Sequence, residues 1–384
     1  MNETVLLTGG DGFLGHALTL RLLKEGYSVI CVDDFRRRRA VKEMGSFSAT
    51  PIKKMKEKEK VFNTIGEFDF LNHSMERNYR TLYAIINKYK PSIIINLAQQ
   101  PAAPYSQISR KHATTTSIGN IIGTINMLYA IKETKSQASL IQIGTMGEYQ
   151  PDVNVDIPEG LFKFKINGRE SRESIFPRRP GSFYHASKVA CTYYIDFACR
   201  SWGINALDIQ QAPVFGLWTP EIEETGLFTR FDSDESFGTV VNRFIVQAII
   251  GHPLTLYGKG LHSRGFLSIN DSIQALMLAV KNPPKNGYST WNQLTEPLSM
   301  VDVANQVIEA ATEKGINIDT INIPSPRTEV TEKHHYNPIT KKLKKLGYKP
   351  TRTIKDESLY AFDVLDKKEL IGLENVMMPK IMWR

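Results

Sequence analysis

The chain has 384 residues, of which 41% are hydrophobic, 23% are charged and three are cysteines. This composition excludes a disordered chain. The length indicates about two domains at roughly 100–200 residues each. The cysteines are scattered and form no C-x-x-C pair, which excludes a disulfide framework and a zinc ribbon. The formal net charge of +8 is compatible with a solvated basic surface, an anionic small substrate or a nucleic acid, and only local motifs can separate these.

In chain order, short apolar runs alternate with helical patterns over the first 210 residues. Strands are predicted at residues 5–8, 28–32, 92–97, 139–143 and 206–209. Helices are predicted at residues 13–23, 78–90, 113–132 and 183–201, where apolar residues recur every three to four positions. This alternation predicts an α/β fold with a Rossmann-like, doubly wound parallel sheet.

One segment interrupts this rhythm. Residues 35–62 contain four consecutive arginines, 36–39, and a lysine-rich run, 53–60, at a place where a short helix would be usual. We predict that this basic insertion is a solvated, mobile loop; a role in phosphate binding or substrate gating is the alternative.

After about residue 211 the alternation loosens, and turn-rich stretches separate short elements. We expect a smaller, mixed α/β C-terminal lobe. The first lobe would comprise residues 1–210, with residues 265–295 returning to it, and the second lobe residues 211–264 and 296–384.

The N-terminal residues favour neither export nor membrane insertion. MNETVLLTGG lacks a basic region followed by a long apolar run, and no stretch of about 18 apolar residues occurs in the chain. We therefore expect no signal peptide and no membrane span. Because Cys31, Cys191 and Cys199 are odd in number and scattered, a reducing, cytoplasmic location is expected.

A glycine-rich turn lies between the first predicted strand and the first predicted helix. Gly9, Gly12 and Gly15 form a G-x-x-G-x-x-G pattern, and Asp33 ends the second predicted strand. Glycines let the backbone approach a pyrophosphate at the helix N-terminus, and the acid can accept hydrogen bonds from the adenosine ribose. Asp33 favours NAD over NADP, although Arg36 could neutralise a 2′-phosphate.

A second motif places a tyrosine and a lysine on one helix face. Tyr184 and Lys188 are four residues apart, and Thr145 follows the strand predicted at residues 139–143. A nearby ammonium lowers the pKa of a tyrosine and makes its phenolate a usable base for a sugar hydroxyl, which Thr145 can share. The alternative is a helical pair on the surface.

Together these motifs resemble the extended short-chain dehydrogenase/reductase superfamily of nucleotide-sugar enzymes, and Asn120 matches its mid-helix N-x-x-G-T motif at residues 120–124. The resemblance covers nearly the whole chain. Segments 103–106, 144–149, 237–244, 251–260 and 326–329 are similar to a narrower family, the UDP-sulfoquinovose synthases. That likeness implies synthesis of UDP-6-sulfoquinovose from UDP-glucose and sulfite, with NAD as cofactor and without a metal.

The resemblance also implies the course of the reaction. Tyr184 takes the proton of the glucose C4 hydroxyl, assisted by Lys188 and Thr145, while a hydride passes to NAD. The 4-ketone acidifies the C5 hydrogen, and loss of that proton and of the C6 hydroxyl gives a 5,6-ene. Sulfite then adds at C6, and the hydride returns to C4. Such enzymes are formally classed as hydrolases acting on carbon–sulfur bonds.

One departure from the superfamily concerns the elimination. Sugar 4,6-dehydratases have Thr-Asp-Glu after this strand, whereas here Met146 and Gly147 replace the two acids. This replacement argues against an ordinary 4,6-dehydratase and removes a carboxylate that would repel sulfite. We hypothesise that Glu148 or His185 handles the elimination protons.

The resemblance assigns further residues to the ligands. The predicted NAD site comprises Gly9, Gly12, Phe13, Leu14, Asp33, Asp34, Arg36, Thr64, Ile65, Leu97, Gln99, Asn120, Ile143, Tyr184, Lys188, Gln211 and Val214. The predicted UDP-sugar site, reaching into the second lobe, comprises Gln100, Arg110, Thr145, Tyr184, Gln211, Thr239, Gln247, Thr255, Tyr257, Arg264, Arg327 and Glu329. Thr64 takes the place of the acid that contacts adenine after the third strand.

Two other functions stay open at this point. One is a different UDP-sugar 4-epimerase or 4,6-dehydratase, and the other is a non-catalytic, RNA-binding member of the superfamily. We expect no nucleic-acid partner, because a binding module would not need Thr145, Tyr184 and Lys188. A homodimer or larger homo-oligomer is expected, and a partner protein could deliver the sulfite for a sulfolipid or glycan pathway.

Overall fold

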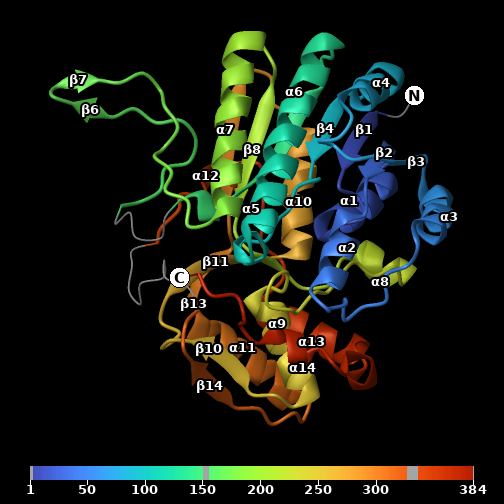
Figure 1. Cartoon of the computed structure of the whole chain (residues 1–384), viewed down its shortest axis with the longest axis vertical. Coiled ribbons are helices and arrows are strands. Elements are labelled where there is room, and N and C mark those ends of the chain that lie inside the picture. Colours follow the sequence, from blue (N-terminus) through green and yellow to red (C-terminus); the bar gives the residue numbers. More distant parts are fainter. Residues whose placement is uncertain (1–2, 150–154, 327–335, 384) are drawn as a thin grey trace.

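A seven-stranded parallel β-sheet forms the centre of the first lobe in the computed structural model (Figure 1). The structure describes residues 3–149, 155–326 and 336–383. The strand order is β12-β8-β5-β4-β1-β2-β3, and every neighbouring pair is parallel. The strands are β1 (Thr4–Thr8), β2 (Ser28–Asp33), β3 (Phe68–Asn72), β4 (Ile93–Asn96), β5 (Ser139–Thr145), β8 (Ala206–Gln211) and β12 (Tyr288–Gln293). The predicted doubly wound, Rossmann-like sheet is confirmed.

Helices cover both faces of this sheet. Successive strand residues point to opposite faces, so Leu6 and Leu7 of β1 enter different hydrophobic cores, and both are fully buried. Helices α1 (Phe13–Lys24) and α10 (Ile269–Lys281) pack together on one face. On the other face lie α4 (Tyr79–Tyr89), α6 (Gly123–Glu133) and α7 (Phe183–Trp202). The helix predicted at residues 113–132 is divided into α5 (Arg110–Ser117), the π-helical η2 (Ile118–Ile122) and α6.

The second lobe lies below the carboxyl ends of the sheet in Figure 1. Its strands are β9 (Val214–Phe215), β10 (Leu254–Tyr257), β11 (Ser263–Ser268), β13 (Glu296–Ser299) and β14 (Thr320–Ile323). They form two small sheets, β13-β11-β9 and β10-β14. Helices α9 (Val240–Ile250), α11 (Met300–Glu313) and α13 (Ile354–Val364) surround a separate core with Phe244, Val303 and Ala361 at its centre. Between these segments, α10 and β12 lie in the first lobe.

Several short elements connect the two lobes and the loops. They are α8 (Pro220–Thr225), α12 (Lys341–Lys345), α14 (Glu374–Met377), the 3-10 helices η1 (Tyr105–Gln107), η3 (Met146–Glu148) and η4 (Lys367–Leu370), and the hairpin of β6 (Lys165–Ile166) and β7 (Arg169–Glu170). The hairpin stands away from the body of the molecule in Figure 1. Among the described residues, no helix combines the length and the apolar character that crossing a membrane requires.

The basic insertion is helical, so the prediction of a solvated loop is wrong. It forms α2 (Arg36–Glu43) and α3 (Met55–Ile65). Lys58 of α3 is buried, and its Nζ lies 2.9 Å from Asp11 Oδ1 in the glycine-rich turn. Arg38 of α2 donates to the same carboxylate from Nε and Nη2, at 2.6 and 2.7 Å. Asp11, which is 27 residues from Arg38 and 47 residues from Lys58 in the sequence, therefore orders the insertion. Charge composition alone does not reveal such a distant partner.

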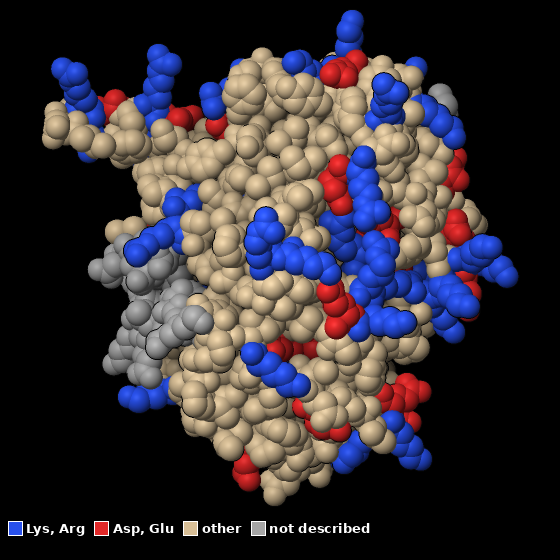
Figure 2. Space-filling view, in the orientation of Figure 1, with Lys and Arg blue, Asp and Glu red and all other residues tan. Residues whose placement is uncertain are grey.

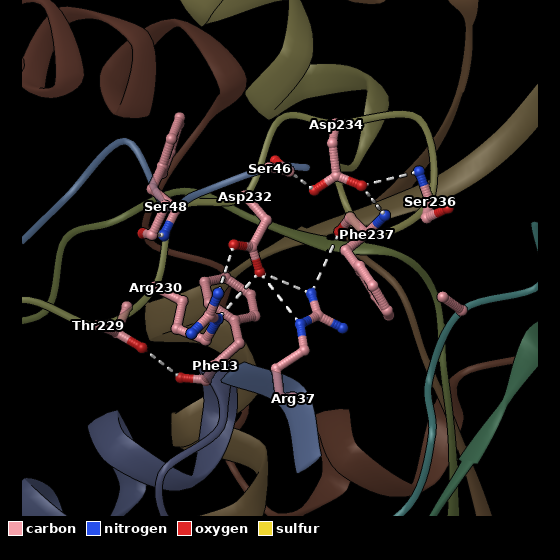
Figure 3. Close-up of polar contacts among 12 residues, drawn as sticks. Phe13, Arg37, Ser46, Ser48, Thr229, Arg230, Asp232, Asp234, Ser236 and Phe237 are labelled. Atoms are coloured by element: carbon pink, nitrogen blue, oxygen red, sulfur yellow. Dashed lines mark hydrogen bonds and ion pairs between the residues drawn. The ribbon is translucent and has the colours of Figure 1, made fainter. Parts of the chain in front are cut away.

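Arg37 attaches α2 to the loop that precedes α9 (Figure 3). Its Nε and Nη2 donate to Asp232 Oδ2 at 3.2 and 2.7 Å, and Arg230 donates to both oxygens of the same acid. The Arg37 guanidinium also lies 3.9 Å from the centre of the Phe237 ring. The half-buried Arg37 and the buried Arg230 thus share one buried acid, which fixes the insertion against the second lobe.

Candidate functional site

A cavity of about 880 Å³ lies between the carboxyl ends of the parallel strands and the second lobe. This is where ligands bind in open α/β sheets. The cavity brings together most of the residues predicted for the NAD site: Gly9, Gly12, Phe13, Leu14, Asp33, Asp34, Arg36, Leu97, Gln99, Ile143, Tyr184, Lys188, Gln211 and Val214. It also brings together Gln100, Thr145, Thr239, Thr255, Tyr257 and Arg264 from the predicted substrate site.

The glycine-rich turn has the shape that a dinucleotide pyrophosphate requires. Gly9 has a φ of +79°, and a Cβ on Gly15 would collide with Gly9 O and lie 2.7 Å from Gly10 Cα. Gly12 caps the N-terminus of α1, so the free N–H groups of the first turn face the cavity. The residues present therefore fit a bound NAD pyrophosphate.

A Gly15→Ala substitution is expected to remove nucleotide binding. The added methyl group cannot be accommodated without moving the turn away from the α1 N-terminus. NAD released by denaturing the purified variant should fall to a small fraction of the wild-type amount. Circular dichroism would show whether the fold persists; an intact variant that retains wild-type NAD would contradict this reading of the turn.

The acid at the end of β2 is held by backbone donors. Asp33 Oδ1 accepts from the Phe35 N–H at 2.7 Å and Oδ2 from the Asp11 N–H at 2.9 Å. Burial raises the pKa of Asp33 to about 6. Arg36 is ion-paired with Asp34 and with Glu76. Because two acids already balance its charge, Arg36 is less able to bind the 2′-phosphate of NADP than the sequence alone indicates.

Thr145, Tyr184 and Lys188 meet at one wall of the cavity. Thr145 ends β5, and the other two side chains lie one turn apart on α7, where both are buried. Lys188 Nζ donates to Gln99 Oε1 and to the Ile143 carbonyl. Burial raises the pKa of Tyr184, while its hydrogen bond with Thr145 lowers it; burial also lowers the pKa of Lys188. A surface helical pair is therefore excluded.

The two candidates for the elimination protons occupy different places. His185 lines the cavity, and a Cβ on Gly147 would lie 2.5 Å from its Cδ2, so only glycine lets this ring lie against the end of β5. Glu148 is fully buried behind the cavity wall and interacts with the Thr145 N–H and the Thr192 hydroxyl. Glu148 does not line the cavity, so the geometry favours His185 as the group that would face a bound sugar.

Four other predicted site residues lie away from the cavity wall. Thr64 and Ile65 end α3, before β3, so they do not follow the third strand as predicted; the insertion displaced the expected register. Arg110 is exposed at the start of α5, and Lys111 lines the cavity instead. Gln247 is buried behind Thr255, whose hydroxyl accepts from its Nε2 at 3.0 Å.

Asn120 also serves a structural purpose. It lies buried behind the wall and joins the backbone of Gln100 to the Ser187 hydroxyl of α7, at 2.7–3.1 Å. It thus positions the helix that carries Tyr184 instead of contacting a ligand. Arg327 and Glu329 lie outside the described residues.

Sequence reasoning missed several residues of the wall, chiefly His73, Met75, Glu76, Lys111, Arg179, Phe237, Arg243 and His262. Arg243 of α9 is the clearest omission. Its Nη1 donates to the Tyr257 hydroxyl at 3.1 Å and its Nη2 to the Thr255 carbonyl at 3.3 Å. Arg243 lies in the segment 237–244 that resembles the narrower family, and one turn after Thr239 at the start of α9, so the signal was present although no role was assigned to it.

Comparison with known proteins places these features in a family. Residues 5–292 match the NAD dependent epimerase/dehydratase family. A chloroplastic UDP-sulfoquinovose synthase of Spinacia oleracea is 39% identical over 100% of this chain and 79% of its own length. A UDP-sulfoquinovose synthase of Sulfolobus acidocaldarius is 40% identical over 99% and 97% of the two chains.

Solved structures agree in fold at lower identity. A UDP-glucose 4-epimerase of Thermotoga maritima, bound to UDP-glucose, has a TM-score of 0.70 at 20% identity and covers 94% of this chain and 97% of its own. A UDP-glucuronic acid 4-epimerase of Bacillus cereus, bound to NAD, has a TM-score of 0.71 at 19% identity over 94% and 98%.

Proposed function

This chain belongs to the NAD-dependent epimerase/dehydratase family and, within it, to the UDP-sulfoquinovose synthases, and on that premise we propose that its cavity converts UDP-glucose and sulfite into UDP-6-sulfoquinovose. One observation carries the proposal: Thr145, Tyr184 and Lys188 meet in a single cavity next to Met146 and Gly147. The first three residues suit oxidation at a sugar hydroxyl, and the last two leave the site without the acids of a 4,6-dehydratase.

NAD is the cofactor of this family, and when bound it would supply a reversible hydride acceptor for the sugar. The glycine-rich turn and the α1 N-terminus would hold its pyrophosphate, and Asp33 its adenosine ribose. Tyr184 accepts the proton of the C4 hydroxyl, which Thr145 orients by hydrogen bonding. The Lys188 ammonium, held by two neutral acceptors, stabilises the Tyr184 phenolate.

We assign the elimination proton to His185, because this residue lines the cavity beside Gly147 and Tyr184. Its Nδ1 lies 3.0 Å from the Ser182 hydroxyl, which fixes the ring at the start of α7. Sulfite would enter beside Arg179, which also lines the cavity and whose N–H donates to the Glu148 carbonyl at 3.2 Å. At the far end, Thr255, Tyr257, Arg243 and Arg264 would hold UDP.

Met146 is expected to matter for the sulfite step. It is buried in the cavity wall, and a carboxylate at this position would repel an incoming anion. Met146→Asp should therefore lower the rate of sulfite incorporation about tenfold or more, while Met146→Leu, of similar volume, should stay within about threefold of wild type. If the Met146→Asp variant added sulfite at the wild-type rate, electrostatic repulsion of sulfite would not explain why a methionine occupies this position.

We further propose that two copies pair through α6 and α7. Seven large apolar side chains on η2, α6 and α7 are 38–56% exposed: Ile118, Ile122, Tyr129, Phe183, Tyr193, Tyr194 and Phe197. Figure 2 shows an area with few charged side chains over these helices. A patch of this kind favours association with a matching helical face of a second copy.

A charge within this patch should separate the copies. Phe197→Asp is expected to convert a wild-type dimer into a monomer in sedimentation-velocity experiments, because the carboxylate would have to be buried against an apolar partner. Phe164→Asp, at an exposed phenylalanine outside this patch, should leave the oligomeric state unchanged. A monomeric wild type, or a dimeric Phe197→Asp variant, would count against this interface.

A direct assay separates the proposal from its alternatives. The purified protein is incubated with UDP-glucose with and without sulfite, and nucleotide sugars are identified by mass spectrometry. A sulfonated nucleotide sugar that forms only with sulfite supports the proposal, whereas UDP-galactose would indicate an epimerase and a 4-keto-6-deoxy sugar a dehydratase. Absence of turnover with tight, salt-sensitive RNA binding would favour the binding module.

Other assignments rest on the same premise. The formal class of a hydrolase acting on carbon–sulfur bonds, a protein that delivers sulfite, and a reducing, cytoplasmic location are proposals. The three cysteines are unpaired and buried, which suits a reducing compartment. Figure 2 shows basic side chains on the side of α2 and α3 interspersed with acidic ones, which weakens the case for a nucleic-acid surface.

A further inference from the structure

Two buried carboxyl groups lie behind the cavity wall, and the proposed reaction uses neither of them. Glu148 follows β5, and Asp208 is in β8, which pairs with β5. Both side chains are fully buried. We refer to Glu148 and Asp208 as the carboxyl pair.

A single hydroxyl joins the two acids. Thr192 Oγ1, on α7, lies 2.6 Å from Asp208 Oδ2 and 3.1 Å from Glu148 Oε2. A threonine hydroxyl has one hydrogen, so it can be donated in full to only one of two acceptors. The shorter contact identifies Asp208 as the acceptor. The contact with Glu148 is then favourable when Glu148 is a protonated carboxyl that donates to the threonine oxygen.

The charges around the carboxyl pair are few and can be named. Arg178 Nε lies 3.9 Å from Glu148 Oε2, and this arginine side chain is 2% exposed. The Tyr288 hydroxyl lies 3.3 Å from Asp208 Oδ2, Lys188 faces the pair from α7, and Tyr149 lies under the Arg178 guanidinium. Burial raises the pKa of Glu148 to about 7 and also raises the pKa of Asp208.

The carboxyl pair is connected to two of the catalytic side chains. Glu148 Oε1 lies 3.4 Å from the Thr145 nitrogen, at the strand end that presents the Thr145 hydroxyl. Thr192 is one helical turn after Lys188 and two turns after Tyr184 on α7. A negative charge on Glu148 raises the pKa of Tyr184, after the larger effect of burial, and also raises that of Lys188.

We propose that Glu148, Thr192 and Asp208 form a proton-holding relay behind the active site, in which one proton shared by the two acids sets the charge that Tyr184 and Lys188 experience. Glu148 and Asp208 are positioning residues, not catalytic ones, since they act through Thr145 and α7. The relay rests on the proposed function for its effect on turnover, but its proton exists whether or not sulfite is the substrate. Loss of that proton above neutral pH raises the pKa of Tyr184, so a smaller fraction of Tyr184 is ionised and able to accept a proton at a given pH.

Infrared spectroscopy of the wild-type protein tests the relay without turnover. A difference spectrum between wild type and Glu148→Gln at pH 6 should contain the C=O stretching band of a protonated carboxyl, and this band should disappear as the pH is raised to 8.5. Absence of the band at pH 6 would overturn the proposal. Failure of the sulfite assay with the band present would refute the proposed function alone.

Paired substitutions at Thr192 test the effect on catalysis. Thr192→Ser keeps the hydroxyl, while Thr192→Val keeps the shape and removes it. The serine variant should reproduce the wild-type dependence of kcat on pH, and the valine variant should displace it by about one pH unit, equal to a tenfold change in the ionisation ratio. The KM for UDP-glucose should change little. Identical profiles for the two variants would show that Thr192 only fills space.

The Glu148→Gln variant tests the direction in which the dependence of kcat on pH is displaced. The amide mimics the protonated acid at every pH and can still donate to Thr192. Above neutral pH, the dependence of its kcat on pH is expected to be displaced to lower pH relative to wild type. The reason is that no charge develops on residue 148 to raise the pKa of Tyr184. A displacement of this profile to higher pH would contradict the relay, and so would a profile and a kcat that are both the same as in wild type.

Discussion

Tyr184→Phe is expected to lower the rate of sugar conversion by about 10²–10⁴-fold, the range that a lost general base accounts for. Phenylalanine keeps the ring that packs at the start of α7 but cannot accept the proton of the C4 hydroxyl. Because Tyr184 is buried in the cavity wall beside Thr145, no nearby water is expected to replace it efficiently. Turnover of UDP-glucose with sulfite, followed by mass spectrometry, measures the loss.

Tyr193→Phe is the matched control for this experiment. Tyr193 lies on the same helix, is 46% exposed and does not line the cavity. It should keep wild-type turnover. Both variants should retain bound NAD and the wild-type melting temperature. A Tyr184→Phe enzyme within tenfold of wild type would mean that another group removes the proton.

Asp11→Asn is expected to lower the free energy of unfolding by about 3–5 kcal/mol, the cost of leaving a buried charge without its partner. Asp11 is the acid that Lys58 and Arg38 share, and the side chains of Asp11 and Lys58 are only 2% and 1% exposed. The amide would leave the buried ammonium uncompensated and release α2 and α3 from the glycine-rich turn. Urea denaturation, with tryptophan fluorescence as the signal, measures the change.

The pH dependence of this effect has a defined sign. Burial raises the pKa of Asp11, but the hydrogen bond from Arg38 and the charges of Lys58 and Arg38 outweigh it, so the folded-state pKa lies below the ordinary 3.8. The stabilisation is therefore present above about pH 4 and is lost as the pH falls through the folded-state pKa. Lys60→Met, at an exposed lysine of the same helix, should change stability by no more than about 0.5 kcal/mol. Equal effects of the two variants would refute a specific role for Asp11.

Local patterns were sufficient to predict the sheet and the centre of the site. The strand at residues 5–8 begins with three consecutive apolar residues because helices cover both faces of the sheet. Gly9, Gly12 and Gly15 are required by the geometry of a turn only a few residues long. Tyr184 and Lys188 lie on the same face of a helix because they are one helical turn apart. These constraints act over short stretches of chain, so a single sequence displays them.

The insertion and the outer parts of the site depend on distant partners. Lys58 looks like one of several solvated lysines until Asp11 is placed 2.9 Å from it. Thr64 was expected after the third strand because the length of α2 and α3 could not be inferred. Arg110 and Lys111 differ by one position on α5, a rotation of about 100° that decides which of them faces the cavity. Burial of Glu148 follows from Thr192 and Asp208, both far along the chain.

The fate of the hydrogen at C4 tests the central claim most directly. UDP-glucose carrying deuterium at C4 is incubated with sulfite and the purified protein, and the product is analysed by mass spectrometry and NMR. The account predicts a sulfonated nucleotide sugar with the sulfonate on C6, the gluco configuration at C4 and the deuterium still on C4. A sulfonated product that has lost the deuterium, or a deuterated UDP-galactose without sulfur, would contradict it.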